Sequence, residues 1–327
     1  MTKTGELEVE PLPETTFGGV IAGTDLTDLS ARMWVEIEAA ANEYGMLIFP
    51  TQHLDPYALA LFAKRFGPLE GAGQKGADRA RRVSNRRADS SVLTPQDPTW
   101  LTLSYPTRHW HMDGTFNPVP PKICMLSAVL VPSRGGQTCF ADMCAAYDAL
   151  DQSTKEKIAG LNAYHSNLIG TTRVLPQTNQ ADLTALVGNA PRDGYYGLDY
   201  CADAPLRPLV RYHPVTNRPT LFVGRHVFRI PGMSPEASER FLNELVQTAC
   251  RSPRVYEHEW QVGDIIVFDN RRVLHRALAY DDQDETRELL NCRIAGDAET
   301  DAGLVTVEAQ RSVEVQSAEL ARLRRRK

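Results

Sequence analysis

The chain has 327 residues, a formal net charge of −5 and 42% hydrophobic residues. This composition supplies a large core, excludes a disordered chain, and argues against general nucleic-acid binding. The longest apolar run, residues 123–131, is interrupted by Ser127 and is far too short to cross a bilayer. The first residues, MTKTGELEVE, lack the pattern of a secretion signal, so we expect a cytoplasmic protein that acts without a membrane.

The first hundred residues predict two helices, one buried strand and a long loop. Helical spacing of apolar residues covers 29–45, which ends at Gly45, and 54–67. Between these segments the apolar run MLIFP predicts a buried strand. Residues 70–98 are polar, basic and rich in turn-forming residues, so we expect a functional loop with at most one short strand.

The rest of the chain predicts mostly short strands. Helices are expected at 142–161 and 234–250, and an irregular segment at 166–196. Six short runs bounded by turn signals predict strands: PLVRYH, PTLFVG, RVYEHEW, DIIVFD, RRVLHRAL and ELLNCRI. The pattern is typical of a mainly β fold with helical cover, a barrel or a jelly roll. The basic end, RLRRRK at 322–327, follows a helix-like stretch and is interpreted as a solvated tail.

The stretch RHWHMDGTF at 108–116 contains the first candidate metal ligands. On a strand, residues i and i+2 project from the same face, so His111 and Asp113 can converge on one ion. A third ligand must come from a distant segment, and His275, on the strand after WQVGDIIVFDN, is the best candidate. A His-x-Asp pair without further evidence is a metal site in about one case in ten. His109 is interpreted as structural.

Two histidines and one carboxylate on one face of an octahedral ion leave the opposite face open. This is the arrangement of non-haem Fe(II) oxygenases, although zinc in a hydrolase can use the same ligand types. Thr138, at the start of a predicted strand, and Arg287, before the strand ELLNCRI, favour an oxygenase. A guanidinium beside a hydroxyl can bind a carboxylate in a pocket that excludes most water. The molecule 2-oxoglutarate has one carboxylate for such an arginine and, at its other end, a keto acid for iron.

Five blocks of the sequence resemble the taurine dioxygenase and 2,4-dichlorophenoxyacetate dioxygenase family of Fe(II)/2-oxoglutarate oxygenases. They are GVIAGTDLTDLS, FAKRFGPLEG, HWHMDGTFNPVPPKICMLSAVLVPSRGGQTCFADMCAAYDAL, RPLVRYHPVTNRPTLFVG and WQVGDIIVFDNRRVLHRA. The resemblance covers about residues 15–295. It implies a double-stranded β-helix, the cupin-type jelly roll, in a single domain over 1–327 whose residues 300–327 form a C-terminal basic extension.

The resemblance also implies roles for individual residues. His111, Asp113 and His275 would bind Fe(II), with 2-oxoglutarate and O₂ as co-substrates. Thr138 and Arg287 fall at the family positions that hold the distal carboxylate of 2-oxoglutarate. Three further residues match the family but are interpreted as packing or turn residues: Trp260, Asp264 and Asn270.

The substrate side departs from the family pattern. Family members that act on sulfonates or small carboxylates carry another arginine four residues after the 2-oxoglutarate arginine, and here that position is Asn291. Arg293 shares the strand face of Asn291 and Arg287 and is one possible replacement. Other candidate arginines are scattered along the chain: Arg79, Arg81, Arg82, Arg173 and Arg229. A larger, less charged substrate is the third explanation.

The expected reaction is hydroxylation of an unactivated C–H bond in a small organic molecule, because the carboxylate of Asp113 closes the position that related halogenases open for halide. Asn291 and the 70–98 loop favour a carboxylic acid of secondary metabolism, such as a terpenoid or polyketide intermediate. Catabolic oxidation of an aryloxyalkanoate or alkyl sulfonate is the alternative. A zinc hydrolase and a non-catalytic cupin-like binding module rank lower. The expected partner is a small-molecule substrate, and the sequence is also compatible with a homo-oligomer.

Overall fold

The computed structural model describes residues 7–73, 78–87, 89–94, 97, 100–175 and 204–325. Its largest sheet has seven strands in the order β1-β2-β3-β13-β5-β15-β4. In that order the strands are Glu10–Pro11, Gly19–Val20, Met46–Phe49, Ile265–Asp269, Ile123–Leu130, Glu288–Ile294 and Arg81–Ser84. All neighbours are antiparallel except β2 and β3.

A three-stranded sheet packs against the large one. It consists of β12 (Val255–His258), β6 (Thr138–Asp142) and β14 (Val273–Ala277), all antiparallel. Apolar side chains of both sheets form one buried cluster, in which the rings of Phe140 and Phe268 lie 5.3 Å apart. Two sheets that enclose a common core in this way form the jelly roll expected from the sequence.

Two smaller sheets extend the fold beyond the jelly roll. One has the order β11-β7-β8, and the other pairs β10 with β9. Their strands are Val227–Phe228, Asn162–His165, Leu206–Pro208, Pro219–Leu221 and Val210–Tyr212 in that order. These strands pack with nearby helices around two further buried clusters.

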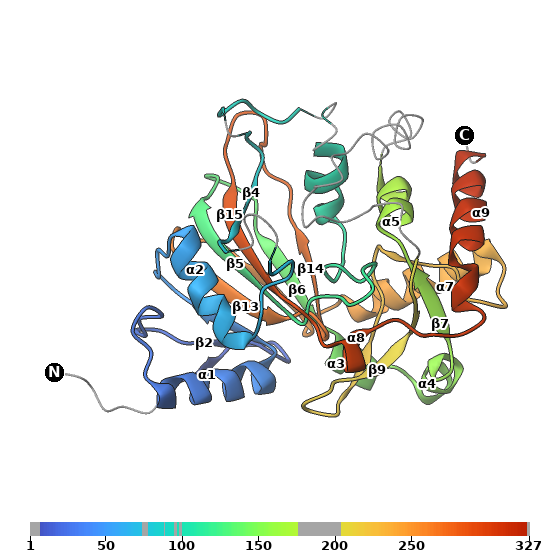
Figure 1. Cartoon of the computed structure of the whole chain (residues 1–327), viewed down its shortest axis with the longest axis horizontal. Coiled ribbons are helices and arrows are strands. Elements are labelled where there is room, and N and C mark those ends of the chain that lie inside the picture. Colours follow the sequence, from blue (N-terminus) through green and yellow to red (C-terminus); the bar gives the residue numbers. More distant parts are fainter. Residues whose placement is uncertain are drawn as a thin grey trace.

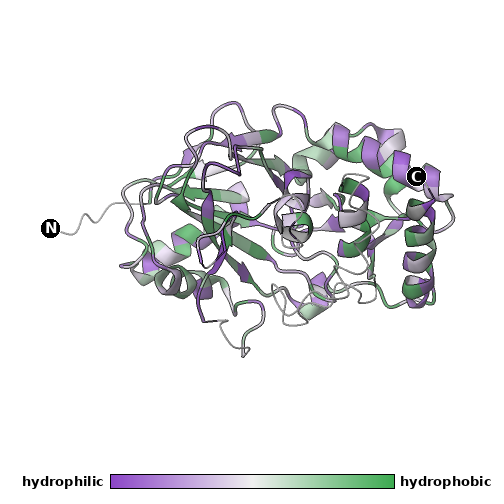
Figure 2. Cartoon of the chain, turned by 90° about the horizontal axis from the view of Figure 1, so that it is seen from above, coloured by the Kyte–Doolittle hydropathy of each residue, from purple (hydrophilic) through white to green (hydrophobic). Residues whose placement is uncertain are grey.

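Helices cover the sheets on two sides (Figure 1). On one side α1 (Ala31–Tyr44) and α2 (Pro56–Ala63) pack on the large sheet. The other helices lie toward the smaller sheets: α3 (Met143–Asp148), α4 (Gln152–Ile158), α5 (Asn167–Val174), α7 (Pro235–Ala249), α8 (Ala298–Asp301) and α9 (Ser312–Arg324). Figure 2 shows hydrophobic residues along the central strands and alternating hydropathy along the surface helices. Among the described helices, none is long and apolar enough to span a membrane.

Local sequence signals account for the ends of the first helix. The Ser30 hydroxyl accepts a hydrogen bond from the Met33 amide at its N-terminus. Gly45 ends the helix with a φ of 72°, a left-handed conformation that glycine adopts without strain. The predicted helices at 29–45, 54–67 and 234–250 and the predicted strand at 46–50 are therefore confirmed to within four residues at each end.

Two predicted segments are wrong in detail. The helix expected over 142–161 is two short helices, because Asp151 caps a new helix by accepting from the Thr154 amide. The segment expected to be irregular over 166–196 begins with α5, capped by Ser166. Residues 176–196 of that region lie outside the described residues.

The interpretation of 322–327 as a solvated tail is also wrong where the structure describes it. Leu323 is 6% exposed and packs in a cluster with Tyr164 and Phe228. The Arg322 guanidinium forms ion pairs with Glu236, Glu239 and Glu319. Helix α9 therefore covers part of the core with its apolar side, although its last residues are strongly basic.

This docking predicts different effects of two substitutions on the same helix. Leu323→Ala should lower the free energy of unfolding by roughly 2–4 kcal/mol, because it removes a buried side chain. Val313→Ala should change it by less than about 0.5 kcal/mol, because Val313 is 58% exposed. Urea denaturation measures both, and equal effects would show that α9 does not pack as described.

Candidate active site

Three side chains from two distant segments meet in one cavity. The Nε2 atoms of His111 and His275 lie 3.6 and 3.9 Å from Oδ1 of Asp113. One candidate ligand atom from each residue lies within 4.8 Å of the other two. The spacing and the donor types suit one divalent ion, since two imidazoles and a carboxylate oxygen would leave its other face open.

Backbone hydrogen bonds bring these segments together. The amide of His111 donates to the carbonyl of His275 at 3.0 Å, and the amide of His275 donates back at 2.9 Å. His275 lies on β14, so this pair fixes the loop that carries His111 against the smaller sheet of the jelly roll. The ring centroids of the two histidines lie 4.2 Å apart.

Asp113 lies in a turn rather than on a strand, and Asn270 holds that turn. The Asn270 side chain accepts from the Asp113 amide at 2.7 Å and donates to the Asp113 carbonyl at 2.9 Å. Gly114 follows with a φ of 59°, and a Cβ there would lie 2.8 Å from Pro121. Asn270 was interpreted as a turn residue, and the structure adds that it positions the backbone of a candidate ligand.

The surroundings keep both histidines in the form that binds metals. His111 Nδ1 lies 2.8 Å from the His109 carbonyl, so Nδ1 carries the proton and Nε2 presents its lone pair toward Asp113. Burial is the largest cause that lowers the pKa of both His111 and His275, and the charge of Arg225 adds to it. Neutral imidazole is the form that a metal ion requires.

Arg293 faces the second oxygen of the candidate carboxylate ligand. Its Nη1 lies 3.9 Å from Asp113 Oδ2, and its Nε donates to Glu70 at 2.5 Å. Burial raises the pKa of Asp113, but the positive charge of Arg293 is the largest opposing effect, and the pKa stays below its usual value. Asp113 is therefore a carboxylate whose Oδ1 faces the histidines while Oδ2 faces a cation.

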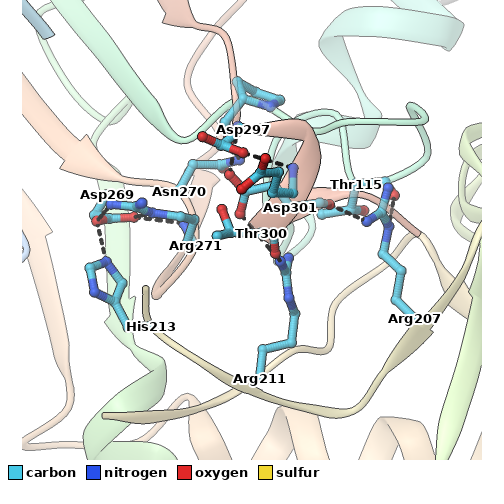
Figure 3. Close-up of polar contacts among 12 residues, drawn as sticks. Thr115, Arg207, Arg211, His213, Asp269, Asn270, Arg271, Asp297, Thr300 and Asp301 are labelled. Carbon is cyan, nitrogen blue, oxygen red and sulfur yellow. Dashed lines mark hydrogen bonds and ion pairs between the residues drawn. The ribbon is translucent and has the colours of Figure 1, made fainter. Parts of the chain in front are cut away.

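A buried polar network holds the loop that follows Asp113 (Figure 3). Arg207 is fully buried and donates to the carbonyls of Thr115 at 2.9 Å, Asp301 at 2.7 Å and Asn117 at 2.5 Å. Burial lowers the pKa of Arg207 to about 9. Nothing in the sequence around Arg207 marked this role, because its partners are backbone carbonyls.

Beside Asn270, Asp269 anchors the turn that leads into β14. Its carboxylate pairs with His213 at 2.7 Å and with Arg271 at 2.6 Å (Figure 3). Burial raises the pKa of Asp269, but Arg271 and His213 more than offset this effect and the pKa stays well below its usual value. The turn is thus tied to the second small sheet, since His213 follows β9.

Arg287 and Thr138 form a second polar group in the cavity. Arg287 is 8% exposed and donates to the Thr138 hydroxyl at 2.9 Å and to the Gly136 carbonyl at 2.7 Å. Burial lowers its pKa to about 10, and no acidic side chain of the described residues forms an ion pair with it. Trp260 also donates to Thr138, at 2.9 Å, so it does more than pack. This cation is available to an anionic ligand.

The cavity has a volume of about 490 Å³ and is lined by both groups. Of the candidate substrate residues, Asn291, Arg293 and Arg82 line it, and Arg82 pairs with Glu288. Arg79 is exposed and Arg229 lies 3.8 Å from Glu319, and neither lines the cavity. The same holds for the two other arginines proposed from the sequence, Arg81 and Arg173. Arg225, which the sequence analysis did not select, lines the cavity instead.

Several known proteins are similar to this chain in sequence and fold. The model of the family described as taurine catabolism dioxygenase TauD, TfdA family matches residues 8–293. An (S)-phenoxypropionate/alpha-ketoglutarate-dioxygenase of Sphingobium herbicidovorans is 41% identical over 91% of this chain and 98% of its own. A pentalenolactone F synthase of Streptomyces arenae is 28% identical over 84% of this chain and 91% of its own.

The crystal structure of AAD-2 in complex with Mn(II) and N-oxalylglycine superposes with a TM-score of 0.77 at 30% identity, over 92% of this chain and all of that one. These matches confirm the predicted double-stranded β-helix and the predicted class of Fe(II)- and 2-oxoglutarate-dependent oxidoreductase. The chain belongs to the taurine catabolism dioxygenase TauD, TfdA family.

Proposed function

We propose that this dioxygenase hydroxylates a C–H bond of a small carboxylic acid, with His111, Asp113 and His275 holding Fe(II). The observation that carries the proposal is the meeting of these three side chains in the cavity that also contains Arg287 and Thr138. A metal ion held by these three side chains and an anion held by Arg287 would therefore lie in the same cavity.

In this proposal each group of the chain has a separate task. Arg287 and Thr138 bind the distal carboxylate of 2-oxoglutarate, which orients its keto-acid end toward the three ligands. Arg293, which Glu70 holds in place, faces the second oxygen of Asp113, so that the other oxygen faces the metal. When bound, Fe(II) supplies the activation of O₂ that is coupled to oxidative decarboxylation of 2-oxoglutarate. The cavity walls position the C–H bond.

The identity of the relatives supports an aryloxyalkanoic acid as the substrate class. The sequence analysis favoured a secondary metabolite, but the phenoxypropionate dioxygenase is more similar to this chain than the pentalenolactone F synthase is, at 41% against 28% identity. Apolar side chains of Phe116, Leu126 and Leu289 line the cavity and suit an aromatic ring. A terpenoid acid is the second candidate, supported by the pentalenolactone F synthase. A zinc hydrolase would leave Arg287 without a task.

The test of this proposal is succinate release under air with Fe(II) and 2-oxoglutarate, across aryloxyalkanoic and terpenoid acids. We expect an aryloxyalkanoic acid to stimulate succinate release and to be hydroxylated in equal amount. Turnover that needs zinc but neither O₂ nor 2-oxoglutarate would contradict the proposal.

Removing the buried guanidinium should affect one co-substrate selectively. We expect Arg287→Met to raise the dissociation constant of 2-oxoglutarate roughly 10- to 150-fold, the size of a lost charge-assisted hydrogen bond, and to leave Fe(II) affinity unchanged. Anaerobic calorimetry with each ligand measures this. Equal loss of both affinities would assign Arg287 a structural role only.

Removing a ligand should remove the metal. We expect His111→Ala and Asp113→Ala to lose stoichiometric Fe(II) binding and succinate release, because two side chains are too few to retain the ion. His109→Gln is the matched control, since the hydrogen bond from His109 to His111 uses its backbone carbonyl, which the substitution keeps. Equilibrium dialysis with iron analysis measures binding, and a His111→Ala protein that keeps one iron per chain would rule this ligand out.

A further inference from the structure

Trp260 lies next to the end of the cavity that Arg287 and Thr138 form, but it does not line the cavity. Its side chain is 7% exposed and packs in the apolar cluster shared by the two sheets of the jelly roll. The indole Nε1–H donates to the Thr138 hydroxyl at 2.9 Å. Trp260 can therefore act on a ligand in the cavity only through Thr138.

Neighbouring residues fix the indole in this position. Thr138 is on β6, the central strand of the smaller sheet, where it pairs with His258 on β12. The rings of His258 and Trp260 lie 4.6 Å apart and are nearly perpendicular. The Asp264 carboxylate lies 3.1 Å from His258 Nε2 and accepts from the Gln261 amide at 3.0 Å. Asp264 thus holds both the histidine that packs on the indole and the turn that follows it.

Both acceptor positions of the Thr138 hydroxyl are filled. A hydroxyl can accept two hydrogen bonds and donate one. Trp260 supplies one donor from Nε1 and Arg287 supplies the other from Nη2, each at 2.9 Å, and neither group can accept in return. No described residue accepts a hydrogen bond from the Thr138 hydroxyl. Since Thr138 lines the cavity, its O–H is left to donate to a ligand there.

Arg287 also presents donors to this end of the cavity. Its Nε donates to the Gly136 carbonyl and its Nη2 to Thr138, while its Nη1 has no hydrogen-bond partner in the described part of the chain. Tyr280 also lines the cavity, and burial raises its pKa to about 12, so its phenol stays neutral. A carboxylate suits the donors of Arg287 and Thr138, because both of its oxygens accept.

We propose that Trp260 is a positioning residue that fixes the Thr138 hydroxyl as a hydrogen-bond donor to the distal carboxylate of 2-oxoglutarate. This inference rests on the proposed function, which assigns that carboxylate to Arg287 and Thr138. A distal amide has one acceptor and one donor group, so its NH₂ faces a donor whichever way it is turned. Without the indole N–H, one acceptor position of Thr138 becomes free for that NH₂ while the amide oxygen faces Arg287. Trp260 therefore helps to select an acid over an amide without contacting either.

The test compares two ligands that differ only at the distal end. N-oxalylglycine has the metal-binding end and the distal carboxylate of 2-oxoglutarate, and N-oxalylglycinamide has an amide in place of that carboxylate. Calorimetric titration into the Mn(II)-loaded protein gives both dissociation constants without turnover. We expect Trp260→Phe to lower the preference for the acid roughly 2- to 13-fold, the size of one neutral hydrogen bond. Trp34→Phe is the matched control and should keep the preference, because Trp34 packs on Phe62 and Phe66 and does not line the cavity.

Variants of Thr138 separate positioning from packing. Thr138→Val alone should lower the preference for the acid, because it removes the donor itself. In that protein there is no hydroxyl to orient, so adding Trp260→Phe should leave the preference unchanged. Thr138→Ser keeps a hydroxyl, and in that background Trp260→Phe should again lower the preference.

Two results would overturn the inference. One is an unchanged preference in Trp260→Phe, and the other is an equal effect of Trp260→Phe with and without the Thr138 hydroxyl, which would show that the indole acts through packing. If N-oxalylglycine does not bind to the wild-type protein with Mn(II), the proposed function is contradicted. Binding to the wild type with a preference that Trp260→Phe does not alter contradicts the inference alone.

Discussion

The site depends on the pair of backbone hydrogen bonds between His111 and His275. These residues are far apart in the sequence, and their imidazoles can share one ion only because the two backbones pair as an antiparallel bridge. Asn270 then fixes the backbone of Asp113, and Arg207 fixes the carbonyls that follow it. The positions of the three side chains are therefore set by main-chain hydrogen bonds, which reduces the ordering that metal binding has to impose.

The charged groups of the cavity have different effects on their neighbours. Burial and nearby cations keep the two histidines neutral, while Arg293 keeps Asp113 ionised. Arg293 is in turn balanced by Glu70, so it contributes little net charge to a ligand. Arg287 has no such carboxylate among the described residues, and the cost of burying it is offset when an anion binds. A cavity of this kind favours an anionic ligand such as 2-oxoglutarate.

The sequence predicted the parts of the site that depend on side-chain chemistry at fixed spacing. His111, Asp113 and His275 converge as expected, and Thr138 and Arg287 are in contact, because the strands that carry them were recognisable from apolar periodicity. Asn270 and Arg207 were missed as supporting residues, since their roles depend on hydrogen bonds with the backbone and on tertiary packing. The same reason explains α9, where a basic composition conceals the burial of Leu323.

The account rests on His111, Asp113 and His275 binding one metal ion, and on that ion completing the site for 2-oxoglutarate. Calorimetric titration of 2-oxoglutarate into the anaerobic protein, with and without one equivalent of Fe(II), tests it most directly. We predict one 2-oxoglutarate bound per chain and a much higher affinity when Fe(II) is present, because the keto-acid end gains its partner. Equal affinity with and without Fe(II), or no binding in either case, would contradict this account.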